Sequence, residues 1–564
     1  MALHNIADKV VETDVLVMGG GIAGCPAAAK AAEMGLHVTL VEKAKTERSG
    51  HGGAGLDTVI VYPPGGTGDI IQEVRAWQNN QSRLNGEGRF ADPNIAYRQY
   101  THTEWTLEEM IKLDLPMKWD DDKYNWEPTR DGHIFQLCVH WLDIKPKMAA
   151  SVRKRGVNVL DRVMVVDLLT NKDKVVGATA INTRTGEFVV IKARVVVIAA
   201  GPFARSYEPE TPQFYKYKMR YHGAPGAISG DSWASGYRAG LELANMDIGN
   251  LWNFRLRDDI MMPYGQVVFR DGLPGKAFTA SGMPIEFMGD SRLYAELENR
   301  GLTPIYRSME HFSDDYQKRA EVATADERLI SLKFSEDRRF DPKWHRYELM
   351  INKPHNFGTI SGIVADEDFK TSLKNCFVIG DACAGLASGG PAILAACLIG
   401  DDMPKYVSEA QEPVVDEGQV ESQKQTTLAP LAVKDGTMPM EFECAVRHIN
   451  ERYAGMFKSE GKLREGLRRL ESLRREFLPK LMAKNPHYLM RCLEARNIMD
   501  LTELHLQACL ERKESRGNYL RMDYPERDLK RDNMVTYQRL KDGKPVLEIK
   551  EVPDLKPEYV KEGK

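Results

Sequence analysis

The chain has 564 residues, and its 77 lysines and arginines nearly balance its 81 aspartates and glutamates, which excludes a strongly basic protein that binds nucleic acid or anionic membranes by charge. No apolar run reaches the ~18 residues of a membrane span and the N-terminus lacks a signal-peptide core, so we expect a soluble, cytoplasmic protein of two or three domains. The eight cysteines are scattered without a C-x-x-C pair, which argues against a disulfide scaffold, a zinc site or an iron–sulfur cluster held by this chain alone.

The first predicted elements form a dinucleotide-binding βαβ unit. An apolar strand over 15–17 leads into a G-x-G-x-x-G turn, an alanine-rich helix over 26–34 follows, and a second strand over 38–41 ends on an acid. Glycines let a pyrophosphate approach bare amides at the helix start, and the acid can accept both ribose hydroxyls. We therefore predict a cofactor site that includes Gly19, Gly21, Gly24, Glu42 and the neighbouring Lys43.

Two later segments favour FAD over NAD. Before these two segments, the sequence also predicts a helix over 95–115 and a β-hairpin over 175–192. The buried strand pattern over 194–201 then ends on Ala200 and Gly201, and the apolar run over 376–380 ends on Gly380 and Asp381. Each run alone is typical of a core strand. Together with the βαβ unit they are typical of an enzyme that grips FAD from distant segments.

The order of these patterns predicts an α/β fold with a Rossmann-like FAD-binding domain that a capping domain interrupts. We expect the FAD-binding domain over 1–250 and 354–405, the cap over 251–353, a polar linker over 406–440, and a helical C-terminal domain with a tail over 441–564. Leucines at helical spacing between 463 and 481 predict core packing or a subunit contact.

Several motifs carry a family resemblance. They are the stretches 11–25, 36–50, 145–146, 235–243, 255–265, 304–306, 380–385 and 513–526. On these motifs the chain resembles the flavoprotein subunits of the fumarate reductase and succinate dehydrogenase superfamily, and most of all adenylylsulfate reductase α subunits. The resemblance implies a small substrate held between flavin and cap, an oligomeric assembly, and a ferredoxin-like iron–sulfur partner.

The resemblance also implies roles for single residues. Arg255 and Arg257 stand where it places a substrate-contacting arginine, and His355 and His140 are further candidates, although surface salt bridges and core histidines are the alternatives. Asp231 matches a flavin-contacting acid, and Arg516 is expected to be structural or flavin-adjacent.

The flavin is predicted to be non-covalent. Some relatives attach FAD to a histidine directly after an Arg-Ser pair, whereas here Gly50 separates Ser49 from His51. A shift of one residue in a tight turn re-aims the side chain, so His51 is expected to lie beside the flavin ring or to line the pocket. Ser49, Gly50 and His51 are all predicted to belong to the cofactor site.

Two departures bear on the substrate. The segment 385–394 lacks the arginine that binds a carboxylate in N-R-L-G-G of succinate and fumarate enzymes, and 139–146 lacks the glutamate of I-H-G-E-S-Y-K-P in the adenylylsulfate branch. The prediction is an FAD-dependent oxidoreductase that exchanges electrons between a small substrate and an iron–sulfur partner. A non-catalytic electron-transfer subunit and a carbon–carbon double-bond reductase for a non-dicarboxylate substrate remain the alternatives.

Overall fold

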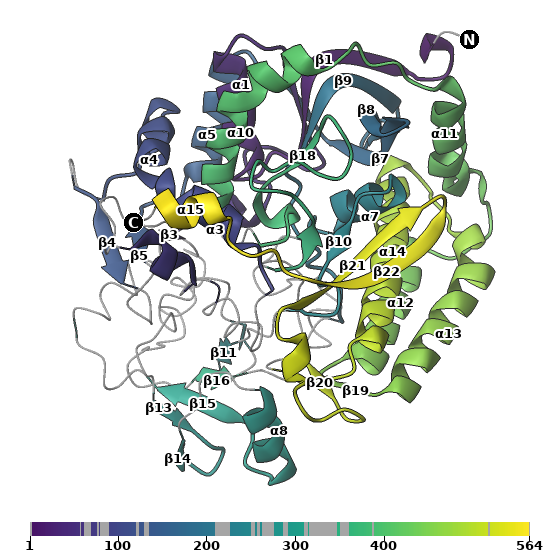
Figure 1. Ribbon diagram of the computed structural model, residues 1–564. Coiled ribbons are helices and arrows are strands. Elements are labelled where there is room, and N and C mark those ends of the chain that lie inside the picture. The colour runs from purple at the N-terminus through teal and green to yellow at the C-terminus, as the bar shows by residue number, and fades with distance from the viewer. Residues whose placement is uncertain are drawn as a thin grey trace.

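The computed structural model describes most of the chain (Figure 1). The described residues are 3–56, 58–60, 69–75, 78, 90–119, 123–128, 135–208, 226–249, 254–256, 260–261, 276–285, 291–308, 314, 347–349, 360–385, 389–516 and 519–562.

A seven-stranded sheet organises the first part of the chain. Five strands run parallel in the order β6, β2, β1, β9 and β18, and the antiparallel hairpin of β7 and β8 extends the sheet from the first half of β9. These strands are β1 (Lys9–Met18), β2 (Val38–Glu42), β6 (Asn158–Asp161), β7 (Val163–Asn171), β8 (Lys174–Asn182), β9 (Phe188–Ile198) and β18 (Cys376–Val378). Register pairs Met18 with Val41 and Ile198, and Ile198 with Val378. The carboxyl ends of four strands therefore meet at one edge, where α/β sheets bind ligands.

Helices cover this sheet where small side chains allow a close approach. The helix α1 (Gly24–Glu33) buries four alanines and packs against α10 (Gly389–Glu409) and α5 (Ile144–Lys154) (Figure 1). The helix expected over 95–115 is broken at His102 into α3 (Pro93–Thr101) and α4 (Thr103–Lys112). A small sheet of β3 (Thr58–Ile60), β4 (Asn125–Pro128) and β5 (Phe135–Cys138) lies beside α10.

The predicted helical C-terminal domain is confirmed. It contains α12 (Pro439–Ala454), α13 (Glu460–Phe477) and α14 (Pro486–Glu511), and α14 is buried along most of its length. Among the apolar residues that recur at helical spacing between 463 and 481, Leu463 and Leu470 are buried, whereas Phe477 is 41% exposed. The strands β21 (Met534–Lys541) and β22 (Lys544–Glu551) then join β10 (Leu243–Ala244) and β17 (Gly362–Ile363). The last helix, α15 (Pro557–Glu562), returns to α3, where the rings of Tyr559 and Tyr97 stack.

The polar stretch expected as a linker over 406–440 contains a packed helix, so that expectation is corrected. The helix α11 (Glu417–Ala432) lies against β7 and β8, where Gln423 accepts a bond from Thr179 Oγ1 at 2.7 Å and donates one to the carbonyl of Leu168 at 3.0 Å. Hydrophobic periodicity missed this helix because side-chain amides hold it to the sheet, and Val420 is its one fully buried apolar residue.

The region expected as a cap forms a sheet of its own. Its order is β12 (Ile260–Met261), β11 (Phe254–Leu256), β16 (Tyr347–Leu349), β15 (Ile305–Ser308), β13 (Lys276–Phe278) and β14 (Pro284–Ile285), with α8 (Ser291–Asn299) beside it. Ala277, Leu297 and Ile305 of this region share a buried cluster with Met456 and Leu520 of the C-terminal domain. Within the described residues, no helix has the length and apolar character needed to cross a bilayer.

Candidate functional site

A cavity of about 1250 Å³, its open mouth included, lies at the edge where the strand ends meet. It gathers most of the cofactor residues predicted from sequence, although these come from six separate segments. They are Gly19, Gly21, Glu42, Lys43, Gly50, His51, Ala200, Gly201, Asp231, Gly380 and Asp381.

The three glycines of the first turn have different structural roles. Gly19 has φ +104°, and a Cβ there would lie 2.6 Å from the carbonyl oxygen of Ala199. A Cβ on Gly24 would lie 1.8 Å from the carbonyl oxygen of Gly19, so α1 packs directly on the turn. A Cβ on Gly21 would meet nothing closer than 4.0 Å, which leaves an open cradle beside the helix start. Such a cradle fits a pyrophosphate.

Glu42 is fixed by the turn that it faces. Its Oε2 accepts the N–H of Gly20 at 2.8 Å and its Oε1 accepts the N–H of Ala44 at 2.6 Å. Each carboxylate oxygen keeps a second acceptor position. Because the side chain lines the cavity at the end of β2, it fits a ribose diol.

Ser49 and Lys145 act from behind the turn. Ser49 Oγ donates to the carbonyl of Gly20 at 3.2 Å, and Lys145 Nζ donates to the same carbonyl. Neither Ser49 nor Gly24 lines the cavity; both shape its wall. The sequence analysis assigned no role to Lys145, although the Lys-Pro pair at 145–146 was among the motifs of the family resemblance.

Lys43 and Asp231 are paired with each other. Lys43 Nζ lies 2.6 Å from Asp231 Oδ2, 2.7 Å from Glu494 Oε1 and 2.8 Å from Ser229 Oγ. Burial alone would lower the pKa of Lys43, but Asp231 and Glu494 outweigh it and raise the pKa. Asp231 begins α7 (Asp231–Arg238) and reaches the cavity as predicted, with its carboxylate also held by Asn497.

This pair continues into a buried ion network with the C-terminal helices. The fully buried Arg205 donates to Glu494 at 2.8 Å and also bonds Glu443, and Arg491 and Arg447 donate to Glu443 at 2.8 and 3.1 Å. Burial would raise the pKa of Glu494, but the cations around it lower the pKa well below its ordinary value. The cavity wall is thereby tied to α12 and α14.

His51 and Asp381 meet across the cavity although 330 residues separate them. His51 Nδ1 lies 3.4 Å from Asp381 Oδ2. His51 follows Gly50 at φ +75°, and Asp381 follows Gly380 at φ +64°. The two glycine turns bring together the residues predicted to lie near the flavin.

The candidate catalytic residues are not brought together in the described part of the chain. His140 is exposed, lies outside the cavity lining, and has its ring 3.8 Å from that of Trp119. Arg255 lies in β11, where the backbone alone is described, and Arg257 and His355 lie outside the described residues.

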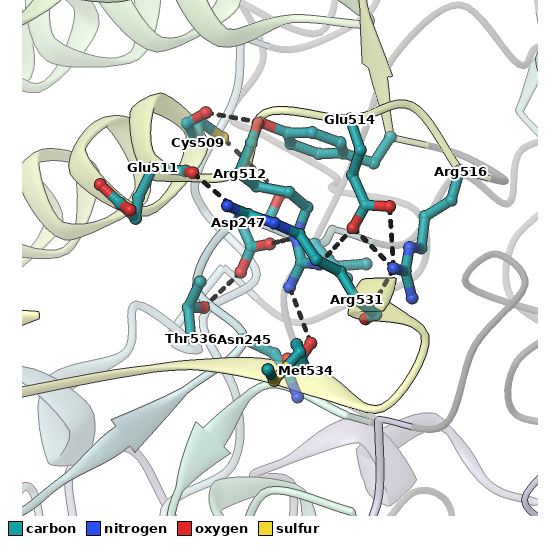
Figure 2. A network of polar contacts seen from close by, with 12 residues as sticks. Asn245, Asp247, Cys509, Glu511, Arg512, Glu514, Arg516, Arg531, Met534 and Thr536 are labelled. Atoms are coloured by element: carbon teal, nitrogen blue, oxygen red, sulfur yellow. Dashed lines mark hydrogen bonds and ion pairs between the residues drawn. The ribbon is translucent and has the colours of Figure 1, made fainter. Parts of the chain in front are cut away.

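A second polar network supports the segments that lead to these candidates (Figure 2). Asp247 is bonded by Arg512 Nε and by Thr536 Oγ1, and Glu514 bridges Arg512 and Arg516 at 2.9 and 2.6 Å. Arg516 is buried within this network, in line with the structural role expected for it.

Asn245, beside this network, joins two other segments. Its Nδ2 donates to the carbonyls of Phe90 and Ile360 at 3.2 and 3.1 Å. The chain before Arg255 and the chain after His355 are therefore fastened to each other.

Apolar lining residues were missed by the sequence analysis. Val163, Met164 and Val165 of β7 and Ala227 and Ile228 line the cavity without any motif. In the sequence these residues show only an apolar pattern, and such a pattern does not indicate which residues of the sheet face a ligand.

Two family models match the chain. A FAD binding domain matches residues 14–252, and a fumarate reductase flavoprotein C-terminal domain matches residues 444–559. The chain belongs to the fumarate reductase flavoprotein superfamily. As a member of this superfamily it is a FAD-dependent oxidoreductase, and FAD fits the glycine cradle, the fixed Glu42 and the open cavity.

Individual relatives of this superfamily align over nearly the whole chain. L-aspartate oxidase of Vibrio cholerae is 22% identical over 92% of this chain and 97% of its own length. The fumarate reductase flavoprotein subunit of Haemophilus influenzae is 21% identical over 92% and 90%. The structure of adenylylsulfate reductase from Archaeoglobus fulgidus superposes with a TM-score of 0.81 at 24% identity, over 97% of this chain and 96% of that one. These likenesses support the fold and the superfamily without selecting a substrate.

Proposed function

We propose that the chain is the flavoprotein subunit of an oxidoreductase that works with an iron–sulfur partner. The observation that carries the proposal is the contrast between a cavity that gathers the predicted FAD residues and cysteines that are dispersed along the chain. Among the described residues, no group of three His, Cys, Asp or Glu side chains could hold a metal ion. Electrons must then reach the flavin from another protein or from a diffusible carrier.

Bound FAD supplies two-electron chemistry at its flavin ring, and the chain's own residues position it. The Gly19–Gly24 turn and Glu42 bind the nucleotide half, while His51 and Asp381 hold the flavin end. The substrate is proposed to lie between this end and the cap, in reach of Arg255, Arg257 and His355, with His140 a weaker candidate. Asn245, which precedes Arg255 in the chain, supports this placement because it bonds the carbonyl of Ile360, which follows His355.

The substrate is proposed not to be a simple dicarboxylate. The segment 385–394 has no arginine to pair with a second carboxylate. We therefore expect that fumarate does not reoxidise the photoreduced protein under anaerobic conditions, and that L-aspartate and succinate do not bleach the oxidised flavin. Bleaching by L-aspartate at a rate typical of enzyme turnover would contradict this part of the proposal.

Purification from the native source, followed by iron analysis, tests the partner. The expected result is co-purification of an iron-containing protein that exchanges electrons with the flavin. An iron-free, monomeric protein whose flavin is rapidly reduced by NADH would overturn the proposal.

A non-catalytic electron-transfer subunit is the second candidate, because the same missing arginine is compatible with loss of turnover. A screen of small-molecule acceptors with the reduced protein and its partner separates the two. Reoxidation by one acceptor class supports the enzyme, and no reoxidation by any acceptor supports the second candidate.

A further inference from the structure

Lys145 is a buried cation that has no carboxylate partner among the described residues. It lies in the first turn of α5 and is 1% exposed. Its Nζ donates to the carbonyl of Gly20 and lies 3.7 Å from Cys25 Sγ, but it forms no ion pair within the described part of the chain. Glu42 is bonded to the N–H of the same Gly20 rather than to this ammonium.

A buried charge without a counter-charge is unfavourable. Removing an ammonium from water is strongly unfavourable unless an opposite charge compensates it. Lys43, a partly buried lysine that lines the cavity, has two carboxylates within 2.7 Å. The contrast indicates that Lys145 is placed to meet an anion that the described residues do not supply.

The geometry of the Gly20–Gly21 peptide indicates where that counter-charge lies. The peptide is trans, so its N–H points opposite to its carbonyl. The carbonyl faces Lys145 and Ser49, behind the turn. The N–H of Gly21 therefore points away from them, toward the cavity that Gly21 lines, and no acceptor among the described residues takes it. A phosphate oxygen there would accept this N–H.

We propose that Lys145 is the built-in counter-charge for the pyrophosphate of FAD, acting through the Gly20–Gly21 peptide. The ammonium fixes and polarises the carbonyl, and this strengthens the N–H on the opposite side as a phosphate donor. Lys145 is thus a positioning residue whose charge is compensated in the FAD complex. The inference rests on FAD in this cavity and not on the proposed substrate or partner.

The test compares Lys145→Met with Ser49→Ala in apo-protein. Both changes remove one donor to the carbonyl of Gly20, but only the first removes a charge. Titration with FAD and with riboflavin, which lacks the pyrophosphate, is followed by flavin fluorescence. We expect Lys145→Met to weaken FAD binding by on the order of 30-fold and riboflavin binding by less than about 3-fold, and Ser49→Ala to weaken FAD binding by less than about 5-fold.

Thermal unfolding of the apo-protein gives a second measurement, in which the variant is expected to be more stable than the wild type although it binds FAD less tightly. Because the variant no longer buries an uncompensated charge, apo Lys145→Met is expected to melt above the apo wild type, and to gain less from FAD. Lys145→Gln replaces it if Lys145→Met does not fold.

Two outcomes would overturn the proposal. One is FAD affinity within about 3-fold of the wild type in the variant. The other is an equal loss of FAD and riboflavin, because a merely structural lysine would give that pattern. Wild-type apo-protein that binds no FAD at all would instead refute the cofactor site itself.

Discussion

The glycine turn over 19–24 and the ion network around Glu494 both border the cavity, and they are built in opposite ways. The turn works because side chains are absent, so that backbone groups touch one another and leave room for a ligand. The network works because long charged side chains pair with one another between the sheet and the C-terminal helices. This difference explains why the glycine turn can be recognised as a motif in the sequence, whereas the charge network, whose members are far apart in the chain, cannot.

Breaking the turn is expected to have the largest effect. In Gly24→Ala the new Cβ would lie 1.8 Å from the carbonyl oxygen of Gly19, so α1 or the turn must move. We expect a loss of more than about 4 kcal/mol in the free energy of unfolding and loss of bound flavin. Chemical denaturation and flavin absorbance measure both.

Gly461→Ala is the matched control, because nothing lies within 4 Å of a Cβ there and the residue is helical. It should change stability by no more than about 1 kcal/mol, in the stabilising direction. Equal effects of the two substitutions would refute the steric account of the turn.

Breaking the network should have the next largest effect. Glu494→Gln removes the charge that faces both Lys43 and Arg205 and leaves those cations buried. The expected loss is about 3 to 5 kcal/mol, measured by denaturant unfolding. Glu465→Gln, which breaks exposed pairs with Arg468 and Arg469, should leave the unfolding midpoint unchanged. An unchanged free energy of unfolding in Glu494→Gln would show that the network does not stabilise the contact between the sheet and the C-terminal helices.

The free energy of unfolding is expected to depend on pH through His505, a buried histidine of the C-terminal helix α14. Burial and the nearby Lys458 lower the pKa of His505 to about 4, and its Nδ1 donates to the carbonyl of Met246 while Nε2 accepts from Tyr207. Between about pH 6.5 and 4 the unfolded side chain is protonated and the folded one is not, so the free energy of unfolding falls as pH falls. The contribution is up to about 3 kcal/mol.

Unfolding of the wild type and His505→Gln across this pH range measures that contribution. The wild type should lose stability more steeply than the variant as pH falls. Parallel curves would contradict a buried neutral imidazole.

Weakening the ligand side of the turn should have the smallest effect. Glu42→Ala removes the predicted ribose acceptor and frees the N–H of Gly20. FAD binding should weaken by about 2 kcal/mol, roughly 30-fold, in a fluorescence titration. Unchanged affinity would count against the assignment of Glu42 to the ribose.

The sequence predicted the strands, the glycine turn and the gathering of the FAD residues, because each depends on a local backbone pattern. It did not reveal α11, whose packing relies on glutamine side chains, nor the pairing of Lys43 with Glu494, which is 451 residues away. Lys145 was visible as half of a Lys-Pro pair, but its role depends on burial behind a turn 125 residues earlier. Long-range contacts of this kind carry no periodicity, so the sequence could indicate residues of a cofactor site without indicating the residues that they pair with.

The most direct test of the account is the flavin content of the purified protein after denaturation and filtration. We expect one FAD per chain, all of it in the filtrate, because Gly50 separates His51 from the Arg-Ser pair and a covalent bond to this histidine is therefore not expected. Flavin that stays with the polypeptide would contradict the non-covalent site, and a chain reconstituted with excess FAD that retains none would contradict the central claim.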